Sequence, residues 1–381
     1  MAAAGYGSRP PGLGVPELDA KDYYVLLSMV NGLGPLRLAK LINVFGCPEA
    51  VWSASERELQ AVPGITRPVV ADLLAKRNRL DPDQEIQRLK RAGIKTVFVD
   101  DSAYPPRLKQ IFDPPKVLYV RGNTEVLQSP MFSVVGARKA TYYGLTVAER
   151  IAFELAEAGL CVVSGMARGI DTAAHKGALR AVKPTVAVLG CGVNVVYPPE
   201  NKKIMAEIIE KGAVISEFPP GTSPAAGNFP QRNRLISGLS AGVLVVEAAE
   251  KSGSLITADF ALEQGRDVFA VPGQVTNKLN KGAHWLIKQG ARLTEAAADI
   301  LDELGYEPDL NKCRDEDPTE DLTQKEKKVY NIISDDPVCS EVIIDKTGLK
   351  SSEVLSILLL MEMKGLVVQL PGQRYVRWLS N

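Results

Sequence analysis

Hydrophobic and polar positions follow three successive patterns along the chain. From about residue 20 to 90, apolar residues recur at helical spacing and are interrupted by two glycine turns, Asn31-Gly32-Leu33-Gly34-Pro35 and Val62-Pro63-Gly64-Ile65. Two units of helix, glycine turn and helix form an internal pseudo-repeat. Such a turn can bring the N–H groups of a helix N-terminus up to a nucleic-acid phosphate. Because lysine and arginine do not cluster at these turns, we favour a small helical bundle that packs or contacts partners.

Between about 95 and 300 the pattern changes to short apolar runs separated mostly by helical stretches. Short buried strands that alternate with helices are typical of a parallel sheet covered on both faces. This region is therefore predicted to be a Rossmann-like, doubly wound α/β domain. Two shorter apolar runs, at 96–99 and 117–120, can extend the sheet. The main strands are expected at 132–135, 160–163, 185–189, 213–216, 243–246 and 268–271.

The end of the chain predicts an acidic linker over 301–321 and a winged-helix domain over 322–381. Thr323 and Glu326 have the spacing of a capping box, which starts a helix. Three helices followed by a two-stranded hairpin are typical of winged helix-turn-helix modules, which commonly bind nucleic acid. The remaining helices and strands of this domain are expected at 341–346, 351–364, 367–370 and 375–378.

Length and composition limit the class of protein. A chain of 381 residues suggests two or three domains, and 45% hydrophobic with 24% charged residues is ordinary for a globular protein. No apolar run approaches the roughly 18–20 residues that span a bilayer. Residues 1–19 are rich in glycine and proline and lack the apolar core of a signal peptide, so they are expected to be a disordered leader.

Cysteine, histidine and charge narrow the chemistry further. Five scattered cysteines predict neither a disulfide framework nor a metal site, which favours a reducing cytoplasm, and two histidines argue against a histidine-based zinc centre. The 45 basic and 45 acidic residues cancel, but nine acidic and two basic residues lie in 302–321. The rest of the chain holds 43 basic and 36 acidic residues, a balance of +7 that permits binding to a polyanion.

Candidate ligand-binding residues follow the predicted strands, because ligands of open parallel sheets bind outside the carboxyl ends of the strands. The loops there are rich in glycine, which allows close backbone approach, and the following helices point their positive N-termini at the same edge. Four arginines, with forked donors suited to phosphate, are placed on this edge. Five or six such loops form a cradle broad enough for a polymer or a large ligand. The arginines are Arg138, Arg168, Arg232 and Arg234.

Other chemistries are weaker or missing. The sequence has neither the dinucleotide-binding glycine fingerprint nor a phosphate-loop ATPase motif. Asp171 and His175 lie one helical turn apart and can form an acid–base pair, although a structural pairing is the more usual case. Glu217 and Glu247 end two strands and are candidate catalytic carboxylates, but such residues more often cap helices or orient arginines.

The central region resembles the DNA-processing protein A (Smf) family. The matching segments occur in the family's order over about 130–295, and the flanking helical and winged-helix regions resemble the family's optional end domains. The segments are Val134-Val135-Gly136-Ala137-Arg138, Ser164 to Asp171, Ala174-His175, Gly190 to Gly192, Tyr197-Pro198, Phe229-Pro230-Gln231-Arg232-Asn233-Arg234, Ser252-Gly253-Ser254-Leu255-Ile256-Thr257-Ala258 and Val271-Pro272-Gly273.

This resemblance implies a homodimer that is not an enzyme and has no cofactor or metal. It implies binding of single-stranded DNA without sequence preference, protection of incoming strands during natural transformation, and loading of a RecA-type recombinase. The main DNA-binding candidates are Gly136, Arg138, Gly165, Arg168, Arg232 and Arg234. Secondary candidates are Lys139, Lys202, Asn233 and Ser254.

The residues themselves suggest how the strand is bound. Aromatic residues make up only 6% of the chain, so phosphate contacts are expected to carry most of the affinity, and binding should fall steeply with salt. Near the edge of the sheet, Tyr142, Tyr197 and Phe229 can stack on a base. In the winged helix, the third helix carries an apolar run over 355–361 and few cations, which suits protein contact better than a duplex groove.

Two other functions remain open. Nucleoside-monophosphate phosphoribohydrolases share this type of fold and resemble the chain around the loop before residue 260. Phe260 stands where their catalytic glutamate is expected, which argues against hydrolysis. The other alternative is a sensor module that binds a free nucleotide signal, which would bind mononucleotides tightly and long oligonucleotides weakly.

Overall fold

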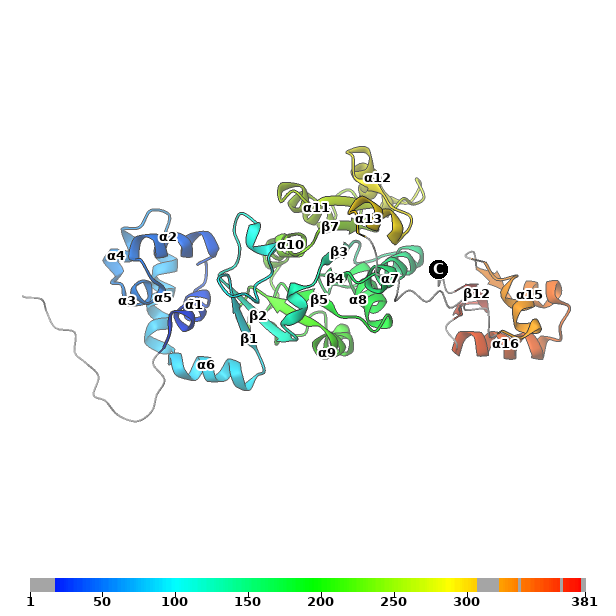
Figure 1. Cartoon of the computed structure of the whole chain (residues 1–381), viewed down its shortest axis with the longest axis horizontal. Coiled ribbons are helices and arrows are strands. Elements are labelled where there is room, and N and C mark those ends of the chain that lie inside the picture. Colours follow the sequence, from blue (N-terminus) through cyan, green and yellow to red (C-terminus); the bar gives the residue numbers. More distant parts are fainter. Residues whose placement is uncertain (1–17, 307–321, 335–336, 364–365, 378–381) are drawn as a thin grey trace, which may run out of the picture.

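The computed structural model describes residues 18–306, 322–334, 337–363 and 366–377. A nine-stranded sheet forms the centre, with helices on both faces (Figure 1). A group of helices precedes it in the chain and a small winged-helix unit follows it. The leader expected at 1–19 lies outside the described residues, except for its last two positions. Most of the expected linker, 307–321, also lies outside them.

The sheet has the order β1-β2-β6-β5-β4-β3-β7-β8-β9. All neighbouring pairs from β6 to β9 are parallel. The predicted doubly wound α/β architecture is therefore confirmed, and the six expected strands all form within one residue or two of their predicted bounds. The strands are β1 (Lys95–Phe98), β2 (Val117–Gly122), β3 (Met131–Val135), β4 (Cys161–Ser164), β5 (Thr185–Val188), β6 (Ala213–Ser216), β7 (Gly242–Val245), β8 (Asp267–Ala270) and β9 (Arg292–Leu293).

The two shorter apolar runs do extend the sheet, but as antiparallel strands. β1 pairs with β2, and β2 pairs with β6, both antiparallel. The sheet is thus mostly rather than wholly parallel. Strand β9 was not predicted, because its two residues are exposed and carry no apolar periodicity.

Helices of the central unit cover the two faces of the sheet. One core contains residues of α10, α11 and α12, and cores on the opposite face contain residues of α7, α8, α9 and α13. These helices are α7 (Tyr142–Glu157), α8 (Ile170–Arg180), α9 (Lys202–Lys211), α10 (Asn228–Leu239), α11 (Gly253–Glu263), α12 (Lys281–Lys288) and α13 (Ala297–Glu303). α13 enters the segment expected to be linker, because Ile300 is fully buried and holds this helix on the core.

The N-terminal helices form the expected tandem repeat. Both glycine turns are followed by helices, and a capping box at Asp19 starts the first helix. α1 packs on the sheet, where the Ser28 hydroxyl lies 2.6 Å from the Tyr119 hydroxyl. The sequence pattern did not predict α3 and α6, which are short or strongly polar. The helices are α1 (Ala20–Ser28), α2 (Pro35–Phe45), α3 (Pro48–Ser53), α4 (Glu56–Gln60), α5 (Arg67–Arg79) and α6 (Pro82–Arg91).

The C-terminal unit has the predicted winged-helix elements plus one short strand. Thr323 and Glu326 form the expected capping box, and Gly348 ends a helix in the left-handed conformation. The unit has its own apolar core. Its elements are α14 (Gln324–Tyr330), β10 (Val338–Cys339), α15 (Ser340–Thr347), α16 (Ser351–Met363), β11 (Val367–Leu370) and β12 (Arg374–Arg377), with strand order β10-β12-β11.

Within the described ranges, no helix has both the length and the apolar character needed to cross a bilayer. The same residues contain no cluster of metal-ligating side chains.

Candidate nucleic-acid interface

The strand order reverses between β3 and β7, and a groove lies at this point. From β3 the chain runs through β4, β5 and β6 in one direction, then returns to β7 and β8 on the other side of β3. Such a switch point leaves a crevice beyond the carboxyl ends of the strands. A groove of about 700 Å³ occupies it. It is lined by the end of β3 and the loop that follows, residues 135–139, and, after β7, by Ala249, residues 252–254, Ile256 and Thr257. We call it the rim groove.

A narrow hollow adjoins the rim groove. It is lined by the loop after β4, including Gly165 and Arg168, and by the loop after β5, including Gly190. The hollow and the rim groove share a set of lining residues, so the two form one continuous concave surface. The shared residues are Arg138, Ala167, Tyr197, Phe229 and Arg232.

Three of the predicted cations lie exposed on this surface. Arg138 and Lys139 line the rim groove, directly after β3. Arg168 lines the hollow with its side chain 58% exposed, and it forms an ion pair with Glu200. This ion pair raises the pKa of Arg168 and lowers that of Glu200. The cations available to a ligand at this surface therefore come from two different loops.

Arg232 lies beneath the same surface. Its Nη1 donates to the carbonyl oxygens of Gly165, at 2.6 Å, and of Val188, while its Nε donates to the Asn233 side chain. Burial lowers the Arg232 pKa to about 10, and the nearby Asp171 carboxylate opposes this. Arg232 thus ties the ends of β4 and β5 together and places a positive charge in the floor of the groove.

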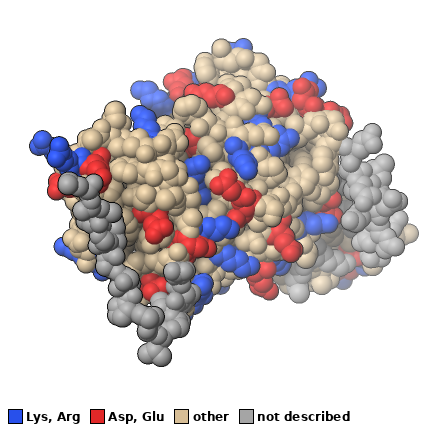
Figure 2. All heavy atoms as spheres, turned by 60° about the vertical axis from the view of Figure 1, so that its left-hand side comes forward, with Lys and Arg blue, Asp and Glu red and all other residues tan. Residues whose placement is uncertain are grey.

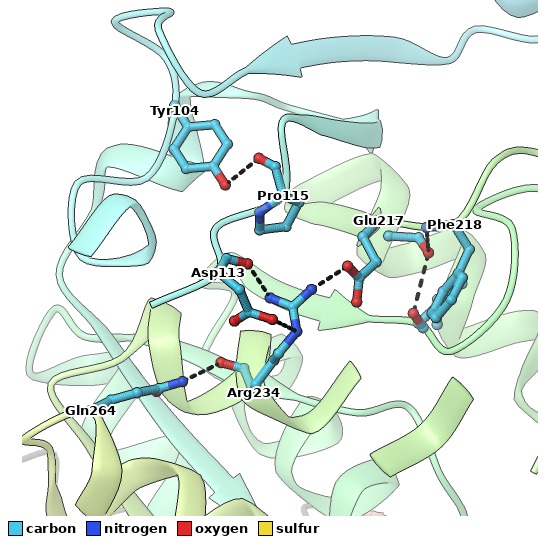
Figure 3. Close-up of polar contacts among 9 residues, drawn as sticks. Tyr104, Asp113, Pro115, Glu217, Phe218, Arg234 and Gln264 are labelled. Carbon is cyan, nitrogen blue, oxygen red and sulfur yellow. Dashed lines mark hydrogen bonds and ion pairs between the residues drawn. The ribbon is translucent and has the colours of Figure 1, made fainter. Parts of the chain in front are cut away.

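The expectation that all four arginines share one open edge is wrong for two of them. Arg232 lines the groove but is only 3% exposed, and Arg234 does not line the groove at all. Its side chain is only 5% exposed and forms ion pairs with Glu217 and Asp113 (Figure 3). Its Nη1 also donates to the Asp113 carbonyl oxygen at 2.9 Å. Residues two apart on a helix point in different directions, so Arg232 and Arg234 cannot both face the groove.

The secondary candidates are divided. Asn233 and Ser254 line the rim groove, and the Asn233 side-chain amide donates to the Gly253 carbonyl oxygen at 3.1 Å, which fixes the start of α11. Ser254 hydrogen-bonds with Ser252, the N-cap residue of that helix. Lys202 is exposed at the first turn of α9 but lines neither the groove nor the hollow.

The glycines of this surface allow close approach. A Cβ atom at Gly165 would lie 2.7 Å from Nη1 of Arg232 and 2.7 Å from Oδ2 of Asp171. Gly136 is crowded in the same way by Ile170 and by the backbone of Glu247. Both glycines line the concave surface. Gly165 therefore lets the loop after β4 lie against Arg232, and Gly136 lets the loop after β3 lie against Ile170 at the start of α8.

Asp171 and His175 are buried structural groups rather than an acid–base pair. The Asp171 carboxylate accepts a hydrogen bond from the Ala167 backbone at 3.2 Å and holds the loop after β4. His175 interacts through Nδ1 with the Thr185 hydroxyl at 2.8 Å, and its Nε2 has no partner among the described residues. Complete burial lowers the His175 pKa to about 3, so the ring is neutral. Asp171 thus bonds to the Ala167 backbone and His175 to the Thr185 hydroxyl, which are different partners.

The two strand-end glutamates also hold structure. Glu247 is fully buried and accepts hydrogen bonds from the backbone and the hydroxyl of Thr141, the N-cap residue of α7. Glu217 pairs with Arg234, and burial raises its pKa to about 7 despite the nearby guanidinium. These arrangements match the capping and orienting roles that the sequence suggested as the more usual ones.

Two aromatic rings lie at the hollow. The rings of Tyr197 and Phe229 have centroids 5.5 Å apart, and the guanidinium of Arg138 lies 5.3 Å from the centroid of Phe229. The third predicted aromatic residue, Tyr142, is exposed at the start of α7 but does not line this surface. Sequence reasoning did not single out Glu200, which forms the ion pair with Arg168 of the hollow.

The fold and this surface define a Rossmann-like protein with a glycine-lined, cationic groove at its topological switch point. The family model described as DNA recombination-mediator protein A matches residues 95–305, and the DprA winged helix domain matches residues 314–373. Protein Smf of Synechocystis is 34% identical over 390 residues, which cover 93% of this chain and 98% of that protein. The chain belongs to the DNA recombination-mediator protein A family, as the sequence resemblance predicted.

Solved structures agree with this assignment. DNA processing protein A from Streptococcus pneumoniae has a TM-score of 0.65 and 35% sequence identity, covering 74% of this chain and 97% of that one. The Helicobacter pylori protein, whose structure describes a mode of binding single-stranded DNA, has a TM-score of 0.51 and 30% identity. It covers 56% of this chain and 97% of that one.

Proposed function

We propose that this protein binds single-stranded DNA without sequence preference along the rim groove and the adjoining hollow. The observation that carries the proposal is the concave surface itself, where exposed cations and bare loop backbone surround a pair of aromatic rings. Arg138, Lys139 and Arg168 supply charge for phosphates, and Tyr197 with Phe229 supplies a stacking surface for bases. Base stacking and phosphate contacts are both insensitive to sequence.

The relatives support a role in DNA processing connected with recombination. On this basis the protein protects incoming single strands and loads a RecA-type recombinase onto them during natural transformation, working as a homodimer in the cytoplasm. It acts by binding and not by catalysis. In support of this, the two candidate carboxylates, Glu217 and Glu247, are held by structural partners. Phe260 stands where the related hydrolases have a catalytic glutamate.

The test is binding of fluorescent oligothymidylates to the full chain and to an Arg138→Ala variant. Arg138 is exposed and lines both parts of the surface, so its loss should weaken binding about tenfold or more without changing thermal stability. The matched control is Arg91→Ala, an exposed arginine at the end of α6, which should bind as the unchanged protein does. Equal binding by both variants would refute the site.

Salt dependence provides a second measurement. Each phosphate neutralised on a single strand contributes a slope of about −0.7 to log K against log salt. Three exposed cations therefore predict a slope of about −2, or a loss of about sixteenfold between roughly 50 and 200 mM salt. A flat response contradicts phosphate-led binding. Release of base from nucleoside monophosphates, abolished by Arg138→Ala, would favour the enzyme instead.

The recombinase and the oligomeric state need separate tests. Strand exchange by a RecA-type recombinase, on single strands already covered by a single-strand-binding protein, should be accelerated by this protein and not by Arg138→Ala. Light scattering should give twice the chain mass. A monomer at micromolar concentration would remove the homodimer from the proposal but leave DNA binding intact.

A further inference from the structure

The hollow differs from the rim groove in its small size and its closed base. It encloses about 20 Å³, against about 700 Å³ for the rim groove. A space of about 10–15 Å³ holds one water molecule, so the hollow admits one or two oxygen atoms of a ligand but neither a base nor a sugar. Of the residues that line the hollow and not the rim groove, Arg168 is exposed and the others are buried. The buried residues are Gly165, Leu189, Gly190, Cys191 and Pro198.

One wall of the hollow contains free backbone donors. The N–H groups of Gly190 and Cys191 find no acceptor among the described residues. Those of Leu189 and Gly192, on either side of them in the sequence, donate at 2.8 and 3.0 Å to carbonyl oxygens of other segments. Buried N–H groups are nearly always paired. Two unpaired ones in residues that line the hollow therefore indicate a site for an acceptor that a ligand supplies.

The guanidinium of Arg232 also has an unused donor. Its Nε and Nη1 donate to oxygen atoms of the protein, whereas Nη2 forms no hydrogen bond with a described residue. Arg232 is only 3% exposed, and it lines both the hollow and the rim groove. A ligand therefore reaches this donor from the concave surface.

Two further arginines reach the hollow from other loops. Arg138 follows β3 and Arg168 follows β4. The guanidiniums of Arg138 and Arg232 lie 5.3 and 6.0 Å from the centroid of the Phe229 ring. Arg138 forms no ion pair with a described residue. Three guanidiniums from three separate segments thus converge on a space that holds one or two oxygen atoms, and their forked donors suit a phosphate.

The charge balance of the hollow favours a doubly charged group. Two carboxylates lie near the three guanidiniums, the buried Asp171 beside Arg232 and the half-exposed Glu200 paired with Arg168. Exposed ion pairs contribute little, so a ligand anion can displace Glu200. Three positive charges then face one negative charge. This excess of two matches a phosphate monoester, which carries about −1.5 to −2 at pH 7, better than the single charge of a diester.

The shape of the surface favours the end of a strand. Loops after β3, β4 and β5 form the walls of the hollow and α10 lies beneath it, so its open side is toward the rim groove. An internal phosphate is linked to a sugar on each side and needs two exits, whereas a terminal phosphate needs one. Tyr197 and Phe229 line both parts of the surface, so a terminal nucleotide can place its phosphate in the hollow and its base on these rings.

Long-range attraction is a weaker explanation for such a preference. On the face that Figure 2 shows, basic and acidic side chains are interspersed, so this face has no single-sign field that would attract every more highly charged strand. Local donors must then distinguish one phosphate from another. Those donors lie in the hollow, so substitutions there should change the preference.

We propose that the hollow binds the terminal phosphate monoester of a single strand, and that the rim groove holds the nucleotides next to it. The three arginines and the N–H groups of Gly190 and Cys191 donate to the outer oxygens of this phosphate. This inference rests on the proposed function, because it states which part of the strand enters the hollow. It adds a preference for strand ends, which binding along the strand does not require.

The test is competition by unlabelled oligothymidylates of about 6 nucleotides against a labelled one of about 30 nucleotides. The short strands carry a 5′-phosphate, a 3′-phosphate or hydroxyls at both ends. A strand phosphorylated at one end should compete about tenfold better than the hydroxyl-ended strand. A preference for either phosphorylated end supports the inference, and equal competition by all three strands overturns it.

Thymidine monophosphate separates a strand end from a free nucleotide. It carries the same phosphate but no chain to occupy the rim groove, so it should compete far more weakly than the phosphorylated strands. Competition as strong as theirs would overturn the inference, because the hollow would then serve a free nucleotide.

Two matched variants locate the preference. Arg168 lines the hollow and not the rim groove, Lys139 lines the rim groove and not the hollow, and both are exposed. Arg168→Ala should reduce the preference for a phosphorylated end to about threefold or less, whereas Lys139→Ala should weaken all short strands and keep the preference at about tenfold. The same preference in both variants would overturn the inference. Thermal melting checks that both variants fold.

The two proposals fail separately. Arg138→Ala should weaken binding of a long hydroxyl-ended strand, because Arg138 also lines the rim groove. If Arg138→Ala binds that strand normally, the proposed function fails at its own site. If Arg138→Ala loses this binding while the unchanged protein does not distinguish phosphorylated from hydroxyl ends, only the inference about the hollow is refuted.

Discussion

The buried Arg234 can be removed without touching the proposed DNA surface, and the outcome should depend on pH. Arg234→Met keeps a chain of similar length but removes the guanidinium. Lost with it are the ion pair with Glu217, the contact of Nε with Asp113 Oδ2 at 3.3 Å, and the hydrogen bond to the Asp113 carbonyl oxygen. The hydrogen bond from Gln264 to the Arg234 backbone remains.

The size of the effect follows from burial. Removing one member of a buried ion pair typically costs about 3–5 kcal/mol, because the other charge is left unpaired. Glu217 can instead become protonated and neutral, since burial already raises its pKa to about 7 from the ordinary 4.5. Without Arg234, which lowers that pKa, it rises further. The variant therefore protonates Glu217 rather than burying its charge.

The pH dependence has a definite sign. Glu217 binds its proton more tightly when folded, so its own contribution to the stability of the unchanged protein falls as pH rises from about 4.5 through about 7. At about pH 5 the carboxyl is neutral with or without Arg234, and the variant loses only hydrogen bonds and the more exposed Asp113 pair. At about pH 8 it also loses the main ion pair. The free energy of unfolding should drop by about 3–5 kcal/mol at the higher pH and by roughly half that at the lower.

Urea unfolding followed by tryptophan fluorescence, at both pH values, measures these differences. Glu217→Gln provides the partner variant, and the double variant should lose less stability than the two single variants together, since the second change finds the pair already broken. DNA binding by Arg234→Met, under conditions where it is folded, should match the unchanged protein. A pH-independent loss below about 1 kcal/mol refutes the reasoning, and so does strict additivity of the two substitutions.

Three further outcomes are expected. Phe229→Ala should weaken oligothymidylate binding about tenfold in a fluorescence titration, because base stacking is worth about 1–3 kcal/mol, whereas Phe229→Tyr should retain it. Glu200→Gln frees Arg168 from its ion pair and should strengthen oligothymidylate binding about two- to fivefold in the same titration. Unchanged binding would mean that Glu200 does not compete with a DNA phosphate for Arg168. Gly165→Ala places a Cβ 2.7 Å from Arg232 Nη1, so it should lower the melting temperature and the affinity together.

Much of the fold could be predicted because local patterns and tertiary packing agree. Strand β6 forms at the predicted residues, since Ala213–Ser216 is a short apolar run buried on both faces of the sheet. The capping box at Thr323 likewise forms as its spacing predicts. The direction of β1 and β2 could not be read, because the same apolar runs suit parallel and antiparallel pairing. Strand β9 has two exposed residues and leaves no sequence signal.

In the candidate site, too, some side chains could be placed from the sequence and others could not. The positions of Arg138 and Gly165 directly after predicted parallel strands placed both correctly at the carboxyl edge, because every loop after a parallel strand emerges there. Sequence position could not show that Arg232 lines the groove and Arg234 does not, because the two residues are only two positions apart on one helix. The difference depends on where Asp113 and Glu217, distant in the sequence, come to lie.

The sequence by itself determined the class of fold, the glycine and arginine loops at one edge of the sheet, and membership of the family. These depend on local periodicity and on residue types in a fixed order, which act within short segments of the chain. Only the tertiary structure decided which arginines are exposed and which carboxylates hold structure. The reason is that exposure and charge pairing are set by contacts between segments far apart in the chain, and a one-dimensional pattern does not contain them.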